Sequence, residues 1–175
     1  RLGRFPAMLA LVSAADGRPL TLHRTYLRCD GLGKAPVPSP KKLMPHAQSR
    51  PLSGAAIRLF AGDASGPAEL GITEGIETAL AVHAMTALPV WASLSATLLQ
   101  GFRPPAGTRR LSIWADKDRS GAGEHAASVL RQRLGDSLDV RILLPPGPIP
   151  ANSRGIDWAD VWLMRQSAAT ERAVA

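Results

Sequence analysis

The sequence contains a single cysteine, Cys29, among 175 residues. One cysteine can form neither an internal disulfide nor a cysteine-based zinc site, so we expect a reducing, cytoplasmic environment. No apolar run approaches the roughly 20 residues of a membrane-spanning helix, so no membrane is expected as a partner. The chain has no signal-peptide pattern and no initiator methionine, and we expect it to be part of a longer protein.

Several nucleotide-binding and metal-binding motifs are also missing. The absence of Gly-x-x-x-x-Gly-Lys-Ser/Thr argues against a P-loop NTPase. Gly121-x-Gly123 follows a strand that ends in acids, unlike a dinucleotide-binding fingerprint. The four histidines lack metal-ligand spacing. These absences leave carboxylates as the candidate metal ligands.

The positive charge is concentrated in the first third of the chain. Residues 1–60 hold ten Lys or Arg and two Asp, a net charge of +8. Residues 61–175 hold eleven Lys or Arg and twelve Asp or Glu, a net charge of −1. A basic lobe beside an acidic site suits an enzyme that processes a polyanion. The alternative is a solvated surface made basic for solubility, and charge alone does not separate the two.

The stretch 70–81 organises the chain, because an apolar run reaches Glu74, then Gly75, and continues with helical spacing. A second stretch, 110–121, repeats this plan with Asp116 and Asp118 before Gly121. Ligands of open α/β sheets bind outside the carboxyl ends of the strands. We therefore expect three hard oxygen ligands around one crevice, a set that suits Mg²⁺ or Mn²⁺ and, through the ion, a phosphate.

The rest of the chain predicts two regions of different kinds. Two apolar runs around Asp16-Gly17 predict a β-hairpin, with His23 and Arg24 on opposite faces of the second strand. Residues 30–54, rich in Pro, Gly and Lys, predict an irregular loop that contacts a nucleic-acid strand, followed by a short strand at 57–60.

After this first region, strands alternate with helices. Strands are predicted at 69–73, 89–93, 110–115 and 138–144, and helices at 75–87, 95–102, 121–134 and 156–166. This order predicts an α/β fold with a four-stranded, mostly parallel sheet flanked by helices and preceded by a small basic β-rich lobe. We expect a basic N-terminal lobe at 1–62, a catalytic domain at 63–166 and a fraying tail at 167–175.

Some of these acids and aromatics also have simpler interpretations. Lys117 and Arg119 could neutralise the two aspartates beside them. Asp157 is interpreted first as the N-cap of the last helix and second as a site residue. Glu77, one turn into the first helix, is expected on the exposed surface. Trp114 and Trp158 are expected in the core.

Four segments together resemble the Toprim domain, and most closely that of primases from phages, plasmids and other mobile elements. They are Thr73-Glu74-Gly75-Ile76-Glu77-Thr78-Ala79-Leu80-Ala81, Val90-Trp91-Ala92-Ser93-Leu94-Ser95, Ala115-Asp116-Lys117-Asp118-Arg119-Ser120-Gly121 and Gly155-Ile156-Asp157-Trp158-Ala159-Asp160-Val161. The N-terminal third, with Lys41-Lys42-Leu43-Met44, is similar to the basic lobe that precedes Toprim in bacterial-type primases.

The resemblance implies a Rossmann-like catalytic core and a role for each acid. Glu74 would be a metal ligand or an acid/base, Asp116 and Asp118 would bind Mg²⁺ or Mn²⁺, and Asp157 matches a later acidic position near the metals. The basic residues assigned to nucleic-acid binding are Arg24, Lys34, Lys41 and Lys42. Three positions depart from relatives: Thr78 replaces a frequent aspartate, and Lys117 and Ser120 replace Asn and Ala.

The implied function is DNA primase activity, which joins ribonucleoside triphosphates into a short RNA primer on single-stranded DNA. A replicative helicase, fused or separate, is a further possible partner. One alternative is a Toprim nuclease that cleaves phosphodiesters. Another is a non-catalytic nucleic-acid-binding module of a larger replication or transfer protein. Topoisomerase chemistry is not expected, because the only tyrosine, Tyr26, lies in a predicted strand of the lobe.

Overall fold

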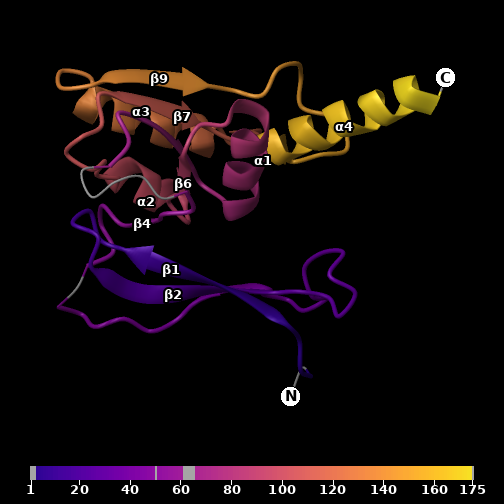
Figure 1. The fold of residues 1–175 in the computed structure, drawn as a ribbon, viewed down its shortest axis with the longest axis horizontal. Helices are drawn as coiled ribbons and strands as arrows, with labels where there is room; N and C mark the ends of the chain where they lie inside the picture. The colour runs from indigo at the N-terminus through magenta and orange to yellow at the C-terminus, as the bar shows by residue number, and fades with distance from the viewer. Residues whose placement is uncertain (1–2, 50, 61–65, 175) are drawn as a thin grey trace.

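The computed structural model describes residues 3–49, 51–60 and 66–174 (Figure 1). The strands are β1 (Ala7–Ser13), β2 (Pro19–Tyr26), β3 (Lys41–Leu43), β4 (Ala56–Ile57), β5 (Glu69–Thr73), β6 (Val90–Ala92), β7 (Arg110–Trp114), β8 (Lys117–Asp118), β9 (Asp139–Leu143) and β10 (Gly155–Ile156). The helices are α1 (Ile76–Thr86), α2 (Ala96–Gly101), α3 (Ala122–Leu134) and α4 (Trp158–Val174). No helix among these residues is both long and apolar enough to cross a membrane.

Four parallel strands form the centre of the fold, in the order β6-β5-β7-β9. The short apolar sequences of β5, β6 and β7 are buried on both faces, as is typical of parallel strands, whereas the edge strand β9 is only partly buried. Successive side chains alternate between two hydrophobic clusters: Leu70 and Ile72 pack with α2 and α3, whereas Val90 and Trp114 pack with α1 and α4. The predicted four-stranded parallel sheet and its helices are therefore confirmed.

The sheet has more strands than the four that were predicted, because the strands of the basic N-terminal region join it. The antiparallel strands β3-β2-β1 continue through β4 into β6, so that all eight strands form one mixed sheet. The junction is one residue pair wide, Ile57 with Ala92. The short strand predicted at 57–60 is observed as β4, which covers only Ala56 and Ile57. Its pairing uses backbone groups that every sequence carries, so the side-chain pattern did not predict which strands it joins.

Two further elements differ from expectation because of their length. The stretch 30–54 contains β3 between Pro40 and Pro45, and a three-residue strand between prolines has no readable period. Helix α4 continues to Val174, well beyond residue 166, because residues 158–174 include neither glycine nor proline. The tail predicted to fray is thus helical through residue 174. In Figure 1 this helix extends away from the sheet.

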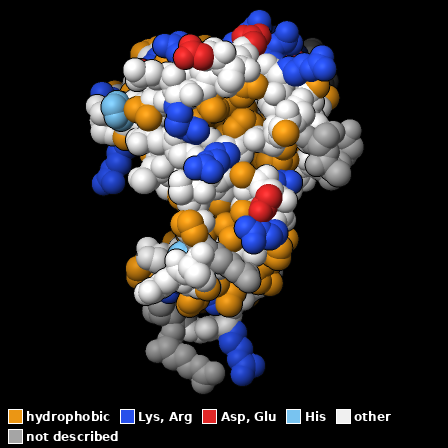
Figure 2. Space-filling model, turned by 90° about the vertical axis from the view of Figure 1, so that its left-hand side faces the viewer, with side chains coloured by type: hydrophobic (Ala, Val, Ile, Leu, Met, Phe, Trp, Pro, Cys, Tyr) orange, Lys and Arg blue, Asp and Glu red, His pale blue; other side chains and the backbone are white. Residues whose placement is uncertain are grey.

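The first region keeps its expected hairpin, with β1 antiparallel to β2. Cys29 is exposed in the turn after β2, where the backbone N–H of Arg28 donates to the carbonyl of Gly33. On the face drawn in Figure 2, Lys and Arg are more numerous than Asp and Glu. The division into regions 1–62, 63–166 and 167–175 stays a prediction, since the border at 62/63 lies outside the described residues.

Candidate metal and nucleic-acid site

Glu74 lies directly after β5, between that strand and α1. The end of β6 is tied to this point: Ser93 donates from its backbone N–H (2.9 Å) and its hydroxyl (3.0 Å) to the carbonyl of Thr73, and Leu94 N–H donates to the carbonyl of Glu74 (2.8 Å). These bonds fix the backbone that carries the Glu74 side chain.

Asp116 and Asp118 follow β7, which is the sheet neighbour of β5. Asp118 belongs to β8, and its pairing with Gly155 of β10 brings Asp157 to the same edge. Helix α3 approaches this turn closely: a Cβ on Gly123 would lie 2.5 Å from the carbonyl oxygen of Asp116. Glycine is therefore required at residue 123 for the helix to contact the backbone of the site.

The structure brings the four predicted acids together around one pocket of about 340 Å³. The pocket is lined by Glu74, Ala96, Asp116, Lys117, Asp118, Ala122, Gly123, Arg154, Gly155, Ile156, Asp157 and Asp160. Asp160 and Arg154 were not among the predicted site residues. Asp160 lies one helical turn after Asp157, and this spacing was the only available signal that the two share a face.

Asp116 is the acid whose ionisation its surroundings most oppose. Burial raises its pKa to about 7, and the negative charges of Asp157, Glu74 and Asp118 act in the same direction. Its Oδ1 atom is buried without a hydrogen-bond partner. Burial and the charge of Asp118 likewise raise the pKa of Glu74, against a hydrogen bond from the backbone of Ala96. A bound cation would relieve this repulsion and give the orphaned oxygen a partner.

Asp118, unlike Asp116, is stabilised in its ionised form by its surroundings. A hydrogen bond from the Ser120 hydroxyl lowers its pKa most, with further donation from the backbone N–H groups of Ser120 and Gly123. Lys117 and Arg119 do not provide this stabilisation. Lys117 donates to the carbonyl of Gly147 (2.6 Å), and Arg119 donates to carbonyls of residues 150, 151 and 153. The interpretation that these two cations neutralise the aspartates is therefore not supported.

Asp157 combines the two interpretations made from sequence. Its Oδ1 accepts from the backbone N–H of Asp160 (2.9 Å), and Asp160 Oδ2 accepts from the backbone N–H of Asp157 (3.0 Å). This reciprocal pair is a capping box at the start of α4, so the N-cap prediction is confirmed. The same carboxylate lines the pocket and contributes to the raised pKa of Asp116.

The two tryptophans expected in the core lie behind these acids. Trp114 and Trp158 are each 8% exposed, and their rings meet edge to face at 4.7 Å. They directly flank the loops that carry Asp116 and Asp157. Their packing holds the two acidic segments against each other.

The four basic residues assigned to nucleic acid do not form one surface. Lys34 and Lys41 lie on the face of the first strands that meets α1, and both approach Glu77. Arg24 and Lys42 are cross-strand partners on the opposite face. The prediction that His23 and Arg24 point to opposite faces of β2 agrees with this arrangement.

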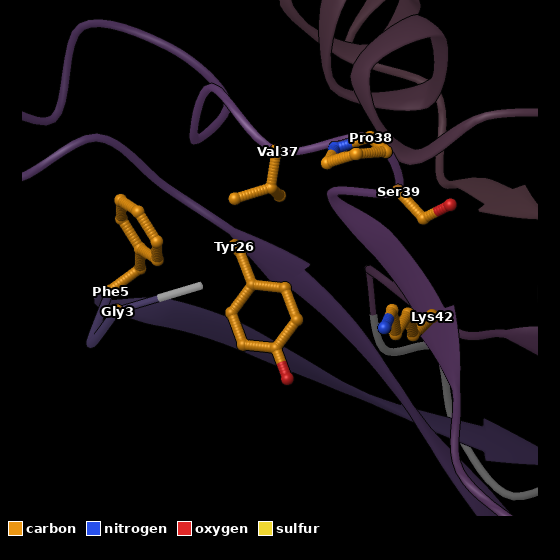
Figure 3. A pocket seen from close by; sticks show the side chains of 7 residues that line it. All are labelled: Gly3, Phe5, Tyr26, Val37, Pro38, Ser39 and Lys42. Carbon is orange, nitrogen blue, oxygen red and sulfur yellow. The ribbon is translucent and has the colours of Figure 1, made fainter. Parts of the chain in front are cut away.

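Lys42 lines an aromatic pocket of about 270 Å³ on this opposite face. Figure 3 shows the ring of Tyr26 between Phe5 and Lys42, with Val37 and Pro38 above it. The Arg24 guanidinium lies 5.7 Å from the centre of the Tyr26 ring. An aromatic ring with cationic groups beside it suits the bases and phosphates of a single strand.

Glu77 is not the free surface residue expected from the sequence. Lys41 Nζ donates to its Oε2 at 2.8 Å, and Lys34 Nζ lies 3.0 Å from its Oε1. Burial opposes its ionisation, but the hydrogen bonds from Lys41 and Lys34 prevail and lower its pKa to about 2. The expectation was wrong because the partners come from a distant segment of the chain.

Within the described ranges, no three His, Cys, Asp or Glu side chains lie close enough together to hold one ion as placed. The donor set nonetheless fits a hard divalent cation, because the five acids that line the pocket offer carboxylate oxygens and one of these oxygens is buried without a partner.

The solved structures with the same fold include catalytic parts of primases. A DNA primase domain from Pseudomonas aeruginosa matches with a TM-score of 0.58 at 16% identity, over 96% of this chain and 50% of that one. The DnaG primase catalytic domain bound to ssDNA matches with a TM-score of 0.58 at 17% identity, over 95% and 50%. The RNA polymerase domain of Mycobacterium tuberculosis DnaG with double-stranded DNA matches with a TM-score of 0.54 at 18% identity, over 95% of this chain and 51% of that one.

These likenesses show a shared fold, and the chain spans about half the length of the primase structures that it matches. No curated protein sequence matches. Residues 1–58 match a family described as Domain of unknown function (DUF7146). Residues 69–168, more than half of the chain and all four acids, match the family described as Toprim domain. The chain therefore belongs to the Toprim family.

Proposed function

We propose that this chain is the catalytic core of a DNA primase, a metal-dependent nucleotidyltransferase that joins ribonucleoside triphosphates into short RNA primers on single-stranded DNA. The observation that carries the proposal is the pocket in which Asp116, buried and without a partner for Oδ1, faces three further carboxylates. Toprim domains typically bind Mg²⁺. Such an ion supplies charge neutralisation at the transferred phosphoryl group.

Each acid is proposed to have a distinct part. Glu74, Asp116 and Asp118 act as catalytic residues and, with Asp157, hold Mg²⁺ or Mn²⁺. Asp118 stays ionised at low pH because donors from the start of α3 stabilise its charge. Asp116 and Glu74 hold their protons more tightly, so binding of a cation would release protons from them.

The basic residues are proposed to bind the template strand on two faces. Lys34 and Lys41 lie on the α1 side, whereas Lys42 lines the aromatic pocket of Figure 3 and Arg24 lies near the Tyr26 ring of that pocket. Structural relatives include primase domains bound to single-stranded and double-stranded DNA, which supports nucleic acid as the partner. A mobile-element origin and a helicase partner stay predictions.

The test is incubation of the protein with single-stranded DNA, labelled ribonucleotides and Mg²⁺ or Mn²⁺. Short labelled products are expected, and Asp116→Asn should abolish them. The matched control is Asp136→Asn, which neutralises an exposed aspartate just after α3 and should keep full activity. Degradation of the DNA without nucleotides would instead indicate a Toprim nuclease. DNA binding with neither activity would indicate a binding module and overturn the proposal.

A further inference from the structure

A single carboxylate on the first helix of the Toprim core holds two lysines of the basic strands. Lys41 Nζ lies 2.8 Å from one carboxylate oxygen of Glu77, and Lys34 Nζ lies 3.0 Å from the other. Lys41 is in β3, which pairs with β2, whereas Lys34 forms an isolated bridge with Leu27. Glu77 thus connects two separate backbone segments to α1.

These ammonium groups lie near the acidic pocket. The charge of Lys41 lowers the pKa of both Glu74 and Asp116, which shows that it is within electrostatic range of them. Glu77 is in the first turn of α1, three residues after Glu74. His23 does not compete for Glu77 as a third cation, because burial and the charge of Lys41 lower its pKa.

We propose that Glu77 is a positioning residue, which holds Lys34 and Lys41 where the phosphates of a bound single strand pass toward the acidic pocket. This inference rests on the proposed function. A free lysine side chain loses rotamer freedom when it binds a phosphate, so a lysine already held in place binds at lower entropic cost. Lys34 and Lys41 remain 47% and 40% exposed, so a phosphate can reach them while Glu77 holds them.

Two simpler roles make different predictions. An exposed ion pair that only supports the fold contributes little to stability and nothing to nucleic-acid binding. A carboxylate that only masks the lysines weakens binding, so its removal would strengthen the affinity for nucleic acid. Positioning predicts the reverse of masking: removal of the carboxylate weakens binding even though the protein becomes more positive.

The first measurement is the rate at which each lysine is acylated, followed by mass spectrometry. The chain has four lysines, and Lys42 serves as the internal reference because it neighbours Lys41 and faces the other side of the sheet. In Glu77→Gln we expect the rates of Lys34 and Lys41, relative to Lys42, to rise roughly threefold, in line with the strength of exposed ion pairs. In Glu77→Asp, which keeps the charge, these relative acylation rates should lie between those of the wild type and those of Glu77→Gln. Unchanged rates would show that Glu77 does not hold them.

The second measurement is the affinity for a short fluorescent single-stranded oligonucleotide at fixed salt. Glu77→Gln should weaken binding roughly three- to tenfold, as expected when two phosphate-binding side chains lose their positions. The control Glu171→Gln removes the same charge from an exposed position in α4 and should leave binding equal or slightly tighter. Equal effects of the two variants, or tighter binding by Glu77→Gln, would overturn the proposal. Neither measurement needs primer synthesis, so failure of the primase proposal would be seen separately.

Discussion

Asp116 is the residue at which burial and like charge combine most strongly. Its pKa is about 7 in the folded protein, above the ordinary value of 3.8. Between pH 3.8 and about pH 7, the folded state therefore keeps a proton that the unfolded state has already lost. The stabilising contribution of this group is complete below about pH 4, decreases as the pH rises to 7, and is absent above it.

We therefore predict that Asp116→Asn changes how stability depends on pH in metal-free protein. The difference in free energy of unfolding between variant and wild type should grow in favour of the variant from pH 5 to pH 8, because asparagine carries no charge for the site to repel. Urea denaturation at a series of pH values measures this difference. A variant curve that stays parallel to the wild-type curve would show that Asp116 does not titrate in this range.

The acids of the pocket could be predicted at the level of single residues, whereas the partners of Glu77 could not. Glu74, Asp116 and Asp118 each follow an apolar strand, and the ends of neighbouring parallel strands lie together in any such sheet. Lys41 is 36 residues from Glu77, and its approach depends on how the first strands pack against α1. No local pattern carries that information.

Among the elements, α4 begins directly after Asp157, an acid of the pocket that also caps this helix. Asp157→Ala should lower the free energy of unfolding by about 1 kcal/mol, because the N–H of Asp160 loses its acceptor. Asp157→Ser should recover most of that loss, since a serine hydroxyl also caps helices. Both variants lack the charge, so the difference between them measures the cap alone.

The same pair of variants tests the proposed role of Asp157 in binding metal. If the carboxylate holds a cation, both substitutions should weaken Mn²⁺ binding in calorimetry to a similar extent, irrespective of the cap. Full Mn²⁺ affinity in Asp157→Ser would restrict Asp157 to its role in the helix.

The long elements were predictable because their signals are local. The capping Ser95 of α2, whose hydroxyl accepts from Leu98 N–H at 3.2 Å, and the apolar runs of the parallel strands can be read directly from the sequence. β3, β8 and β10 have two or three residues each, too few for a period to appear, and β4, expected at 57–60, covers only Ala56 and Ile57. Their pairing is decided by the surrounding tertiary structure.

For the molecule as a whole, the continuous sheet joins the first strands to the Toprim core through β4. We predict that a chain beginning at Gly66 self-associates, because removal of β4 leaves β6 as an apolar sheet edge with unpaired backbone groups. It also uncovers Val90 and Ala92, which pack with Val12 and Ile57 in one cluster. Size-exclusion chromatography with light scattering measures the association.

A second truncation, beginning at Leu52, is the matched control because it keeps β4 on the edge of β6. It should associate less than the chain beginning at Gly66. If the shorter chain is monomeric and unfolds cooperatively, the first strands are a separable module and the sheet junction contributes little.

The exposed thiol of Cys29 offers a practical advantage. As the only cysteine, it can be coupled to one fluorophore or spin label without any substitution. The turn that carries it leads to Lys34, so the label would report motions of the segment that Glu77 contacts. The same thiol can join two molecules through a disulfide in air, so measurements of association need a reductant.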